Sequence, residues 1–314
     1  MTVHPFAIEL LQLLLLIGLS PAFAGWVKVV KCRLQGRSAP GILQPYRDIR
    51  RLFIKDVVLA ENASWIFRFT PYLAFGVTVL AGGIIPLVSV DLPLAATADI
   101  IALVMLFAII RFFTALAGMD IGTAFGGMGA SREMMISSLA EPAMLMAVFT
   151  VSLASSSTSL TQMVTTMGQG QFMIRPSLAF ALIAFIMIAL AETGRIPVDN
   201  PATHLELTMI HEAMILEYSG RYLALIEWAG MMKLVLFFSL GIAAFCPWGI
   251  ASGGDPAALA LGVALFVVKL MLGGVIMVLI ETGMAKMRIF RVSEYLGSAF
   301  LLATLGMIAF FILE

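Results

Sequence analysis

Residues 191–220 gather acidic side chains in a chain that is otherwise strongly apolar. This stretch reads AETGRIPVDNPATHLELTMIHEAMILEYSG and contains one base, Arg195, among five acids. The acids are Glu192, Asp199, Glu206, Glu212 and Glu217. Because burial favours the neutral form of a carboxyl group, a buried carboxyl can take up and release a proton near neutral pH. The chemistry that these residues indicate is proton transfer, although a solvated turn that happens to be acidic is the simpler alternative.

Further charges fall inside long apolar segments, where each costs about 2.5–3.5 kcal/mol on insertion unless it is paired, hydrated or neutralised. The charges well inside such segments are Arg111, Glu141, Lys233 and Lys269. Glu227 and Glu281 lie near segment ends, where we expect their carboxylates to reach the membrane surface. Two interpretations of the deeper charges stay open. They form a water-linked series of protonatable groups, or they form ion pairs that hold helices together.

The elements that must position these charges are membrane helices. The chain is 61% hydrophobic and has a mean hydropathy of +1.02, and only 12% of its residues are charged, against about 25% in soluble domains. About 20 apolar residues cross a bilayer as a helix. Eight stretches come close to that length: 6–30, 69–92, 98–118, 134–155, 174–192, 223–248, 257–282 and 294–313. We therefore predict an all-α, polytopic transmembrane bundle of about eight spans, forming a single integral membrane domain over residues 1–314.

The distribution of Lys and Arg predicts how this bundle is oriented. Fifteen of the 19 basic residues fall in four alternate connections, which are residues 28–68, 119–133, 192–222 and 283–293. The opposite connections and both termini contain only Arg175. Since basic loops stay in the cytoplasm, these four connections are expected inside and both termini outside.

The basic connection 28–68 contains LQPYRDIRRLFIKDVV, residues 43–58. Apolar residues recur there at three- and four-residue steps with Arg and Lys between them, which predicts an amphipathic helix lying at the cytoplasmic membrane surface. Its basic face suits either anionic lipid or a cytoplasmic partner. Both roles are compatible with the pattern.

The other two connections of interest carry glycines and prolines. GMDIGTAFGGMGASRE, residues 118–133, lacks the Gly-Lys-Ser/Thr of a phosphate-binding loop, so we expect glycines for close helix packing and a span opened by Ser131 or Arg132. Pro197 and Pro201 interrupt the helix as the fifth span ends. A helix from Thr203 onward would place Glu206 and Glu217 about 20° apart, on one largely buried face.

Cysteine and histidine are too scarce to hold a redox centre in this chain. Cys32 and Cys246 are predicted at opposite membrane surfaces, where they cannot form a disulfide. An iron–sulfur cluster usually needs four thiolates, and the three histidines show no metal-binding spacing. We therefore expect no metal or cofactor in this chain; any redox centre belongs to partner subunits.

Several of these motifs resemble one known family. Ala191-Glu192-Thr193-x-Arg195-x-Pro197-x-Asp199, then Glu206-Leu207 and Glu217-Tyr218-Ser219-Gly220, resembles the signature of the complex I subunit 1 family. Three further stretches resemble its group 4 membrane-bound [NiFe]-hydrogenase branch, as in formate hydrogenlyase and hydrogenase-4. They are APGILQPYRDIRRLF (39–53), GMDIGTAFGGMGASRE (118–133) and FVVKLMLGGVIMVLIETGMAKMR (266–288). The resemblance covers nearly the whole chain.

The resemblance implies a membrane anchor and proton-coupling subunit of an energy-converting hydrogenase in a prokaryotic cytoplasmic membrane. The expected partners are hydrogenase large and small subunits, which carry the [NiFe] centre and iron–sulfur clusters, and antiporter-like membrane subunits; no nucleic acid is expected. The implied acid-lined proton path comprises Glu141, Glu192, Asp199, Glu206 and Glu217, to which the buried-charge argument adds Lys269. The residues placed in coupling or docking loops by the same motifs are Arg47, Asp48, Arg132, Arg195 and Tyr218.

Two departures from the family pattern limit what carries over. Val198 precedes Asp199 where quinone-reducing members usually have Phe, and Thr203 and His204 stand where further acids are common. The number of protonatable steps and the binding of quinone therefore stay open. The alternatives are a quinone-site subunit of a NADH:quinone oxidoreductase, a stand-alone ion transporter and a passive anchor whose buried charges only pair.

Overall fold

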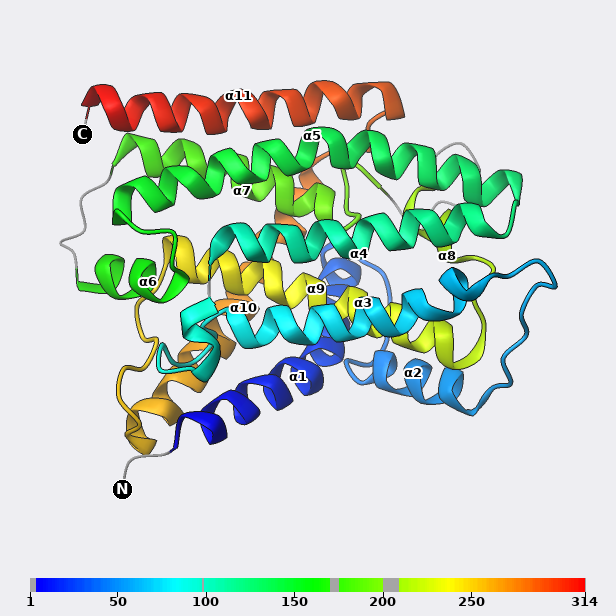
Figure 1. The fold of residues 1–314 in the computed structure, drawn as a ribbon, viewed down its shortest axis with the longest axis horizontal. Coiled ribbons are helices and arrows are strands. Elements are labelled where there is room, and N and C mark those ends of the chain that lie inside the picture. The colour runs from blue at the N-terminus through cyan, green and yellow to red at the C-terminus, as the bar shows by residue number, and fades with distance from the viewer. Residues whose placement is uncertain (1–3, 98, 170–174, 200–208, 314) are drawn as a thin grey trace.

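The computed structural model describes residues 4–97, 99–169, 175–199 and 209–313, and within them the chain is a bundle of long helices (Figure 1). The helices are α1 (Pro5–Leu34), α2 (Gln44–Ile54), α3 (Trp65–Ile84), the 3₁₀ helix η1 (Pro93–Thr97), α4 (Ile100–Asp120), α5 (Ala124–Ser155), α6 (Leu160–Gln169), α7 (Pro176–Glu192), α8 (His211–Ile215), α9 (Gly220–Phe245), α10 (Pro256–Gly283) and α11 (Ile289–Leu313).

Short polar residues begin several of these helices, because they supply an acceptor for an N–H group that has no partner in the first turn. The Ser64 hydroxyl accepts from Ile66 N at the start of α3, and Asp99 Oδ1 accepts from Ile101 N at 2.7 Å at the start of α4. Between the caps the long helices are apolar on nearly every side, as expected where both lipid and neighbouring helices are apolar.

The long helices run back and forth along the bundle, so that both described chain ends and α6 lie at one end of the molecule (Figure 1). We call this the α6 end. The helices α2 and α8 lie at the opposite end, the α8 end. Helix α5 packs against α4, α7 and α11, while α9 packs against α1 and α3. The acidic stretch therefore connects two central helices, α7 and α9, at the α8 end.

The predicted all-α membrane bundle is confirmed. Among the described residues, seven helices are long and apolar enough to cross a membrane. Each of the eight predicted stretches overlaps a long helix, although α3 ends at Ile84, short of the predicted limit at 92. The helix too short to count among the seven is the 17-residue α7, from the stretch 174–192. At 1.5 Å per residue α7 is about 26 Å long, slightly less than the bilayer core. The side of the membrane on which each end lies stays a prediction.

The predicted loop 119–133 is wrong, because most of it is helical. Helix α5 begins at Ala124, capped by the Thr123 hydroxyl, and neither Ser131 nor Arg132 opens the span. The glycines do serve close packing. A Cβ on Gly126 would lie 2.3 Å from Gly118 O, so α4 and α5 approach there closer than any side chain permits.

The acidic connection also differs from its prediction. Residues 200–208, and with them Glu206, lie outside the described residues. The described helix α8 spans only His211–Ile215, and Glu217 is exposed in the turn that follows it. A continuous helix that carries Glu217 on a buried face is therefore not formed. Helix α2 covers Gln44–Ile54 of the predicted segment 43–58 and buries one residue, Ile49.

Candidate proton-transfer site

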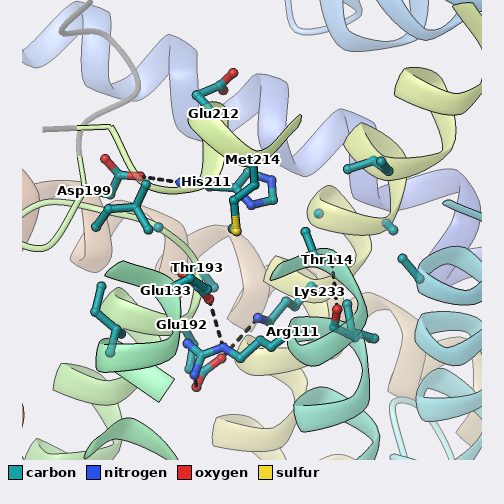
Figure 2. Close-up of a pocket in the computed structure, with 18 of the residues that line it drawn as sticks. Arg111, Thr114, Glu133, Glu192, Thr193, Asp199, His211, Glu212, Met214 and Lys233 are labelled. Carbon is teal, nitrogen blue, oxygen red and sulfur yellow. Dashed lines mark hydrogen bonds and ion pairs between the residues drawn. The ribbon is translucent and has the colours of Figure 1, made fainter. Parts of the chain in front are cut away.

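Four charged side chains from four helices meet inside the bundle (Figure 2). Arg111 of α4 lies between two acids: its Nε is 3.2 Å from Glu133 Oε1 of α5, and its Nη1 is 2.9 Å from Glu192 Oε1 at the end of α7. Lys233 of α9 places its Nζ 3.1 Å from Glu192 Oε2. We call these four residues the charge quartet.

The quartet is buried and formally neutral. The side chains of Arg111 and Glu192 are 4% and 5% exposed, and those of Lys233 and Glu133 are 14% and 15% exposed. Two cations offset two carboxylates, which is the arrangement that makes buried charge tolerable. Arg111 Nε and Nη1 and Glu192 Oε2 contact their partners without hydrogen-bond alignment. Their contacts are therefore mainly electrostatic.

A cavity of about 220 Å³ extends from the quartet towards the α8 end (Figure 2). Besides the quartet, its lining includes further titratable groups, which are Asp199, His211, Glu212 and Glu227. A water molecule occupies about 30 Å³ in the liquid, so the cavity has room for several water molecules with polar partners on its walls. The acids of α7, α8 and α9 thus share one polar space.

Asp199 lies in this cavity wall, at the end of the turn that follows α7. It is 3% exposed, and its Oδ2 accepts a hydrogen bond from His211 N at 3.3 Å. Lys286, in the connection between α10 and α11, is close enough to interact with this carboxylate. Burial lowers the pKa of Lys286 below its ordinary value, while Asp199 opposes that shift.

Glu141 lies on the other side of the quartet, two turns along α5 from Glu133. The Ser137 hydroxyl donates to Glu141 Oε1. Glu141, Arg111 and Glu192 line a small cavity of about 10 Å³, whose other walls are apolar and include Phe107 and Phe237. Among the described residues, no Lys or Arg lies within ion-pair distance of Glu141. Its carboxylate therefore faces the quartet without belonging to it.

A second ion cluster is formed around the buried Glu281. Glu281 of α10, with a side chain only 1% exposed, contacts Lys31 Nζ of α1 at 2.8 Å and Arg195 Nη1 at 3.2 Å. The expectation that Glu281 reaches the membrane surface is therefore wrong, because two cations stabilise it inside. Arg195 belongs to the turn that carries Asp199, so this cluster attaches that turn to α1 and α10.

The remaining predicted site residues are dispersed. Lys269 lies near the α6 end, where its Nζ donates to Cys246 O at 2.6 Å and to Trp248 O. Arg132 donates to Met209 O at 3.0 Å, whereas Arg47 and Asp48 are exposed on α2.

Tyr218, which the motif placed in the coupling or docking loop, is buried. It is 4% exposed, stacks on Phe67 with ring centroids 3.8 Å apart, and donates to Phe67 O at 2.9 Å. The structure thus brings together Glu141, Glu192 and Asp199 of the predicted path, but not Lys269 or Glu217.

Three quartet members were absent from the predicted site. Arg111 and Lys233 stood out as charges inside spans, but nothing in the sequence paired them with Glu192. Glu133 was assigned to a loop. Its spacing from Ser137 and Glu141, at i, i+4 and i+8, places all three on one helical face and could have identified it.

The described residues contain no group of three or more His, Cys, Asp or Glu side chains arranged to bind a metal ion. Cys32 and Cys246 are both free thiols.

Comparisons with known proteins place this chain in a family. The model of the NADH dehydrogenase family matches residues 8–312. Formate hydrogenlyase subunit 4 of Escherichia coli is 33% identical over 280 residues, which cover 89% of this chain and 90% of the relative. Hydrogenase-4 component C of the same organism is 32% identical over 297 residues, which cover 95% of this chain and 93% of the relative.

More distant relatives extend the comparison. A subunit of the NADH-quinone oxidoreductase of Salinibacter ruber is 26% identical over 233 residues, covering 71% of this chain and 63% of the relative. A chain of the membrane-bound sulfane sulfur reductase, an archaeal respiratory membrane complex, has the same fold: its TM-score is 0.84 at 22% identity, covering 98% of this chain and 100% of that one. The chain therefore belongs to the NADH dehydrogenase subunit 1 family.

Proposed function

We propose that the chain is the membrane anchor and proton-coupling subunit of an energy-converting hydrogenase. Support comes from formate hydrogenlyase subunit 4 and hydrogenase-4 component C, which match it over almost their full lengths. The partners in this proposal are hydrogenase large and small subunits, which carry the [NiFe] centre and iron–sulfur clusters, and antiporter-like membrane subunits. The location is the cytoplasmic membrane of a prokaryote.

The observation that carries the proposal is the charge quartet. A protein that only anchored its partners would not need four charges at one point inside a bundle, because a buried ion pair is weak evidence for stability and apolar residues often replace it without loss. Charged residues inside a membrane protein instead mark pathways for ions and protons. The adjoining cavity supplies the connection to the α8 end.

Arg111 is the residue whose movement can change which carboxylates of the site are paired with a cation. Glu192, Glu133 and Glu141 all act on it electrostatically. A shift of Arg111 towards Glu141, across the small cavity between them, weakens its pairing with Glu133 and Glu192. A carboxylate that loses its cation binds a proton more readily. Proton uptake on one side of the quartet is thereby linked to release on the other.

The turn between α7 and α8 is where a partner at the α8 end would act. It carries Asp199 in the cavity wall and Arg195 in the second ion cluster. Movement of this turn changes the distance between Asp199 and the quartet, because Glu192 is the last residue of α7. In this mechanism, redox chemistry in the partner moves the turn, and protons move between the cavity and Glu141.

The substitution Glu141→Gln tests the proton path. Gln keeps the size of the side chain and its contact with Ser137 but cannot carry a proton. We expect the complex to assemble and to retain hydrogenase activity in detergent, while proton movement in proteoliposomes falls to the level seen with a protonophore. Glu294→Gln, at an exposed site on α11, is the matched control. Normal proton movement in the Glu141→Gln complex would show that Glu141 is not on the path.

Isolation of the tagged chain in mild detergent tests its partners. We expect nickel at about one atom per complex, together with iron, in the material that accompanies it. Iron with flavin but without nickel would assign the chain to a quinone-reducing complex instead. A chain that is isolated alone, from membranes whose other complexes stay intact, would favour a stand-alone transporter.

A further inference from the structure

A groove runs along the bundle between α7, α9 and α10. Its volume is about 330 Å³, and its walls are almost entirely apolar. Leu272 and Ile276 of α10 border it and are 59% and 56% exposed, so the groove opens towards the lipid. Two glycines shape its walls. A Cβ on Gly241 would lie 2.9 Å from the Phe185 ring, and one on Gly273 would lie 2.8 Å from the Phe238 ring.

One cation lies in this groove, near the α6 end. Lys269, Leu272, Gly273 and Ile276 share one face of α10, with Lys269 nearest the end of α9. Its ammonium group has three N–H donors, and carbonyl oxygens of Cys246 and Trp248 accept two of them. In the part of the chain that the structure describes, no carboxylate pairs with Lys269. The two carbonyl dipoles and the Trp248 ring, whose centroid lies 5.8 Å from Nζ, stabilise this charge, but no negative charge offsets it.

We propose that the groove binds an anionic phospholipid, with its phosphate on Lys269 and an acyl chain along α10 towards Ile280. The third N–H of Lys269 donates to the phosphate, and the negative headgroup supplies the missing counter-charge. From Lys269 to Ile280 the groove follows α10 for about 16 Å, at 1.5 Å per residue. An apolar chain fits this length without leaving any polar group unpaired.

The size of the groove favours a lipid over a partner's helix. A transmembrane helix is about 10–12 Å across and about 30 Å long, far larger than a cavity of 330 Å³. A helix would also need a carboxylate at the depth of Lys269 to supply the counter-charge. The proposal does not depend on proton transfer through the quartet, because Lys269 has no contact with those four residues.

Cys246 lines the groove beside Lys269, so its alkylation rate reports whether the groove is occupied. The experiment uses the complex purified from its own membrane, with Cys32→Ser in this chain, in nanodiscs of phosphatidylcholine with or without phosphatidylglycerol. The extent of Cys246 modification by N-ethylmaleimide is followed by mass spectrometry of this chain. We expect phosphatidylglycerol to slow the reaction about fivefold, the protection given by a ligand at about four times its dissociation constant.

Two variants and two controls make the result specific. Lys269→Gln removes the charge and Ile276→Trp fills the groove, and each is expected to abolish the protection by phosphatidylglycerol. Leu305→Trp, on the exposed side of α11, should leave it unchanged. The alkylation rate of Cys32, measured in a chain that carries Cys246→Ser, shows any general effect of anionic lipid on thiol alkylation.

Protection that persists in Lys269→Gln, or equal rates with both lipids, would overturn the proposal. Slow alkylation in every lipid would overturn it as well and would assign the groove to a partner's helix.

Discussion

Glu192 contacts two cations from different helices, and both contacts are made by its single carboxylate. Arg111 and Lys233 approach separate oxygens of one carboxylate, so the loss of that carboxylate leaves two buried positive charges balanced by Glu133 alone. Removing one partner of a buried pair costs about 3–5 kcal/mol, because the remaining charge is uncompensated. The quartet is therefore sensitive to single substitutions and more tolerant of substitutions made in pairs.

We expect Glu192→Gln to destabilise the chain by about 3–5 kcal/mol and the double variant Glu192→Gln/Lys233→Met to recover part of that loss. The double variant removes one negative and one positive charge, so Arg111 and Glu133 still balance. Reversible unfolding of the purified complex in mixed micelles measures both free energies. The single variant Lys233→Met completes the cycle, and costs of the two single variants that simply add up to the cost of the double variant would show that Lys233 does not interact energetically with Glu192.

Tyr218 gives a prediction about alkaline stability. Burial is the larger cause that raises the pKa of Tyr218 above its ordinary value of about 10, against a smaller lowering effect of Thr70. Above pH 10 the unfolded chain releases this proton while the folded chain keeps it, so ionisation of the unfolded state lowers stability as pH rises. Tyr218→Phe removes this titration and loses the hydrogen bond to Phe67 O, which costs about 0.5–1.5 kcal/mol.

Unfolding of the Tyr218→Phe variant should therefore depend less on pH above about 10, while the variant is slightly less stable at neutral pH. Tyr72→Phe, at an exposed tyrosine on α3, is the control. Identical pH dependence in wild type and Tyr218→Phe would contradict the burial of this phenol.

The site residues show which part of the chemistry could be predicted from sequence. Glu141 was identifiable because a charge in an apolar segment is costly wherever its partner lies. Glu192 and Asp199 were identifiable because they belong to an acidic stretch of an apolar chain and to the motif that resembles the family. The cations that pair with these acids were not identifiable from the sequence. Arg111 and Glu192, for example, are far apart in the chain and meet only because α4 packs against α5 and α5 packs against α7. The same holds for Lys31, Arg195 and Glu281, whose pairing removed the expected exposure of Glu281.

Helix α5 illustrates how an element was mispredicted. Residues 119–133 were assigned to a connection because they lie between the apolar stretches 98–118 and 134–155, although their glycines were expected to serve close helix packing. Glycine is a poor helix former in water. In the folded bundle these glycines allow close contacts that offset their low propensity, as at Gly129, where a Cβ would lie 2.9 Å from Ala213 Cβ and 3.0 Å from Ile210 O. The apolar stretches themselves were predictable, because twenty-residue apolar runs have few structural alternatives in a bilayer.

Two glycines of α5 provide a matched test of that packing. We expect Gly129→Ala to destabilise the chain, because the new methyl group displaces α8 and with it the cavity wall next to His211. Gly127→Ala should be neutral or stabilising by about 0.5–1 kcal/mol, since nothing lies within 4 Å of its Cβ and alanine favours the helix. Thermal unfolding of the two variants in the same detergent measures the difference. If Gly129→Ala proves as stable as Gly127→Ala, α8 does not pack tightly against α5.

The molecule as a whole separates its charges by position along the bundle. The turns at the α8 end include the exposed basic helix α2, both ion clusters lie between the α8 end and the middle, and the α6 end has few basic residues. The antiparallel course of the long helices brings both described chain ends to the α6 end (Figure 1). Since basic connections stay in the cytoplasm, this arrangement predicts the α8 end inside and the α6 end outside.

Reporter fusions test this orientation directly. We expect alkaline phosphatase to be active, and green fluorescent protein to be dark, when either is fused at the C-terminus, because the first matures only outside the cytoplasmic membrane and the second inside it. Fusions made after Lys286, in the connection between α10 and α11, should give the reverse pattern. Fluorescence from both fusion sites would mean that α11 does not cross the bilayer. A fluorescent C-terminal fusion with active phosphatase after Lys286 would place the α8 end outside, where a cytoplasmic redox partner could not move the turn that carries Asp199.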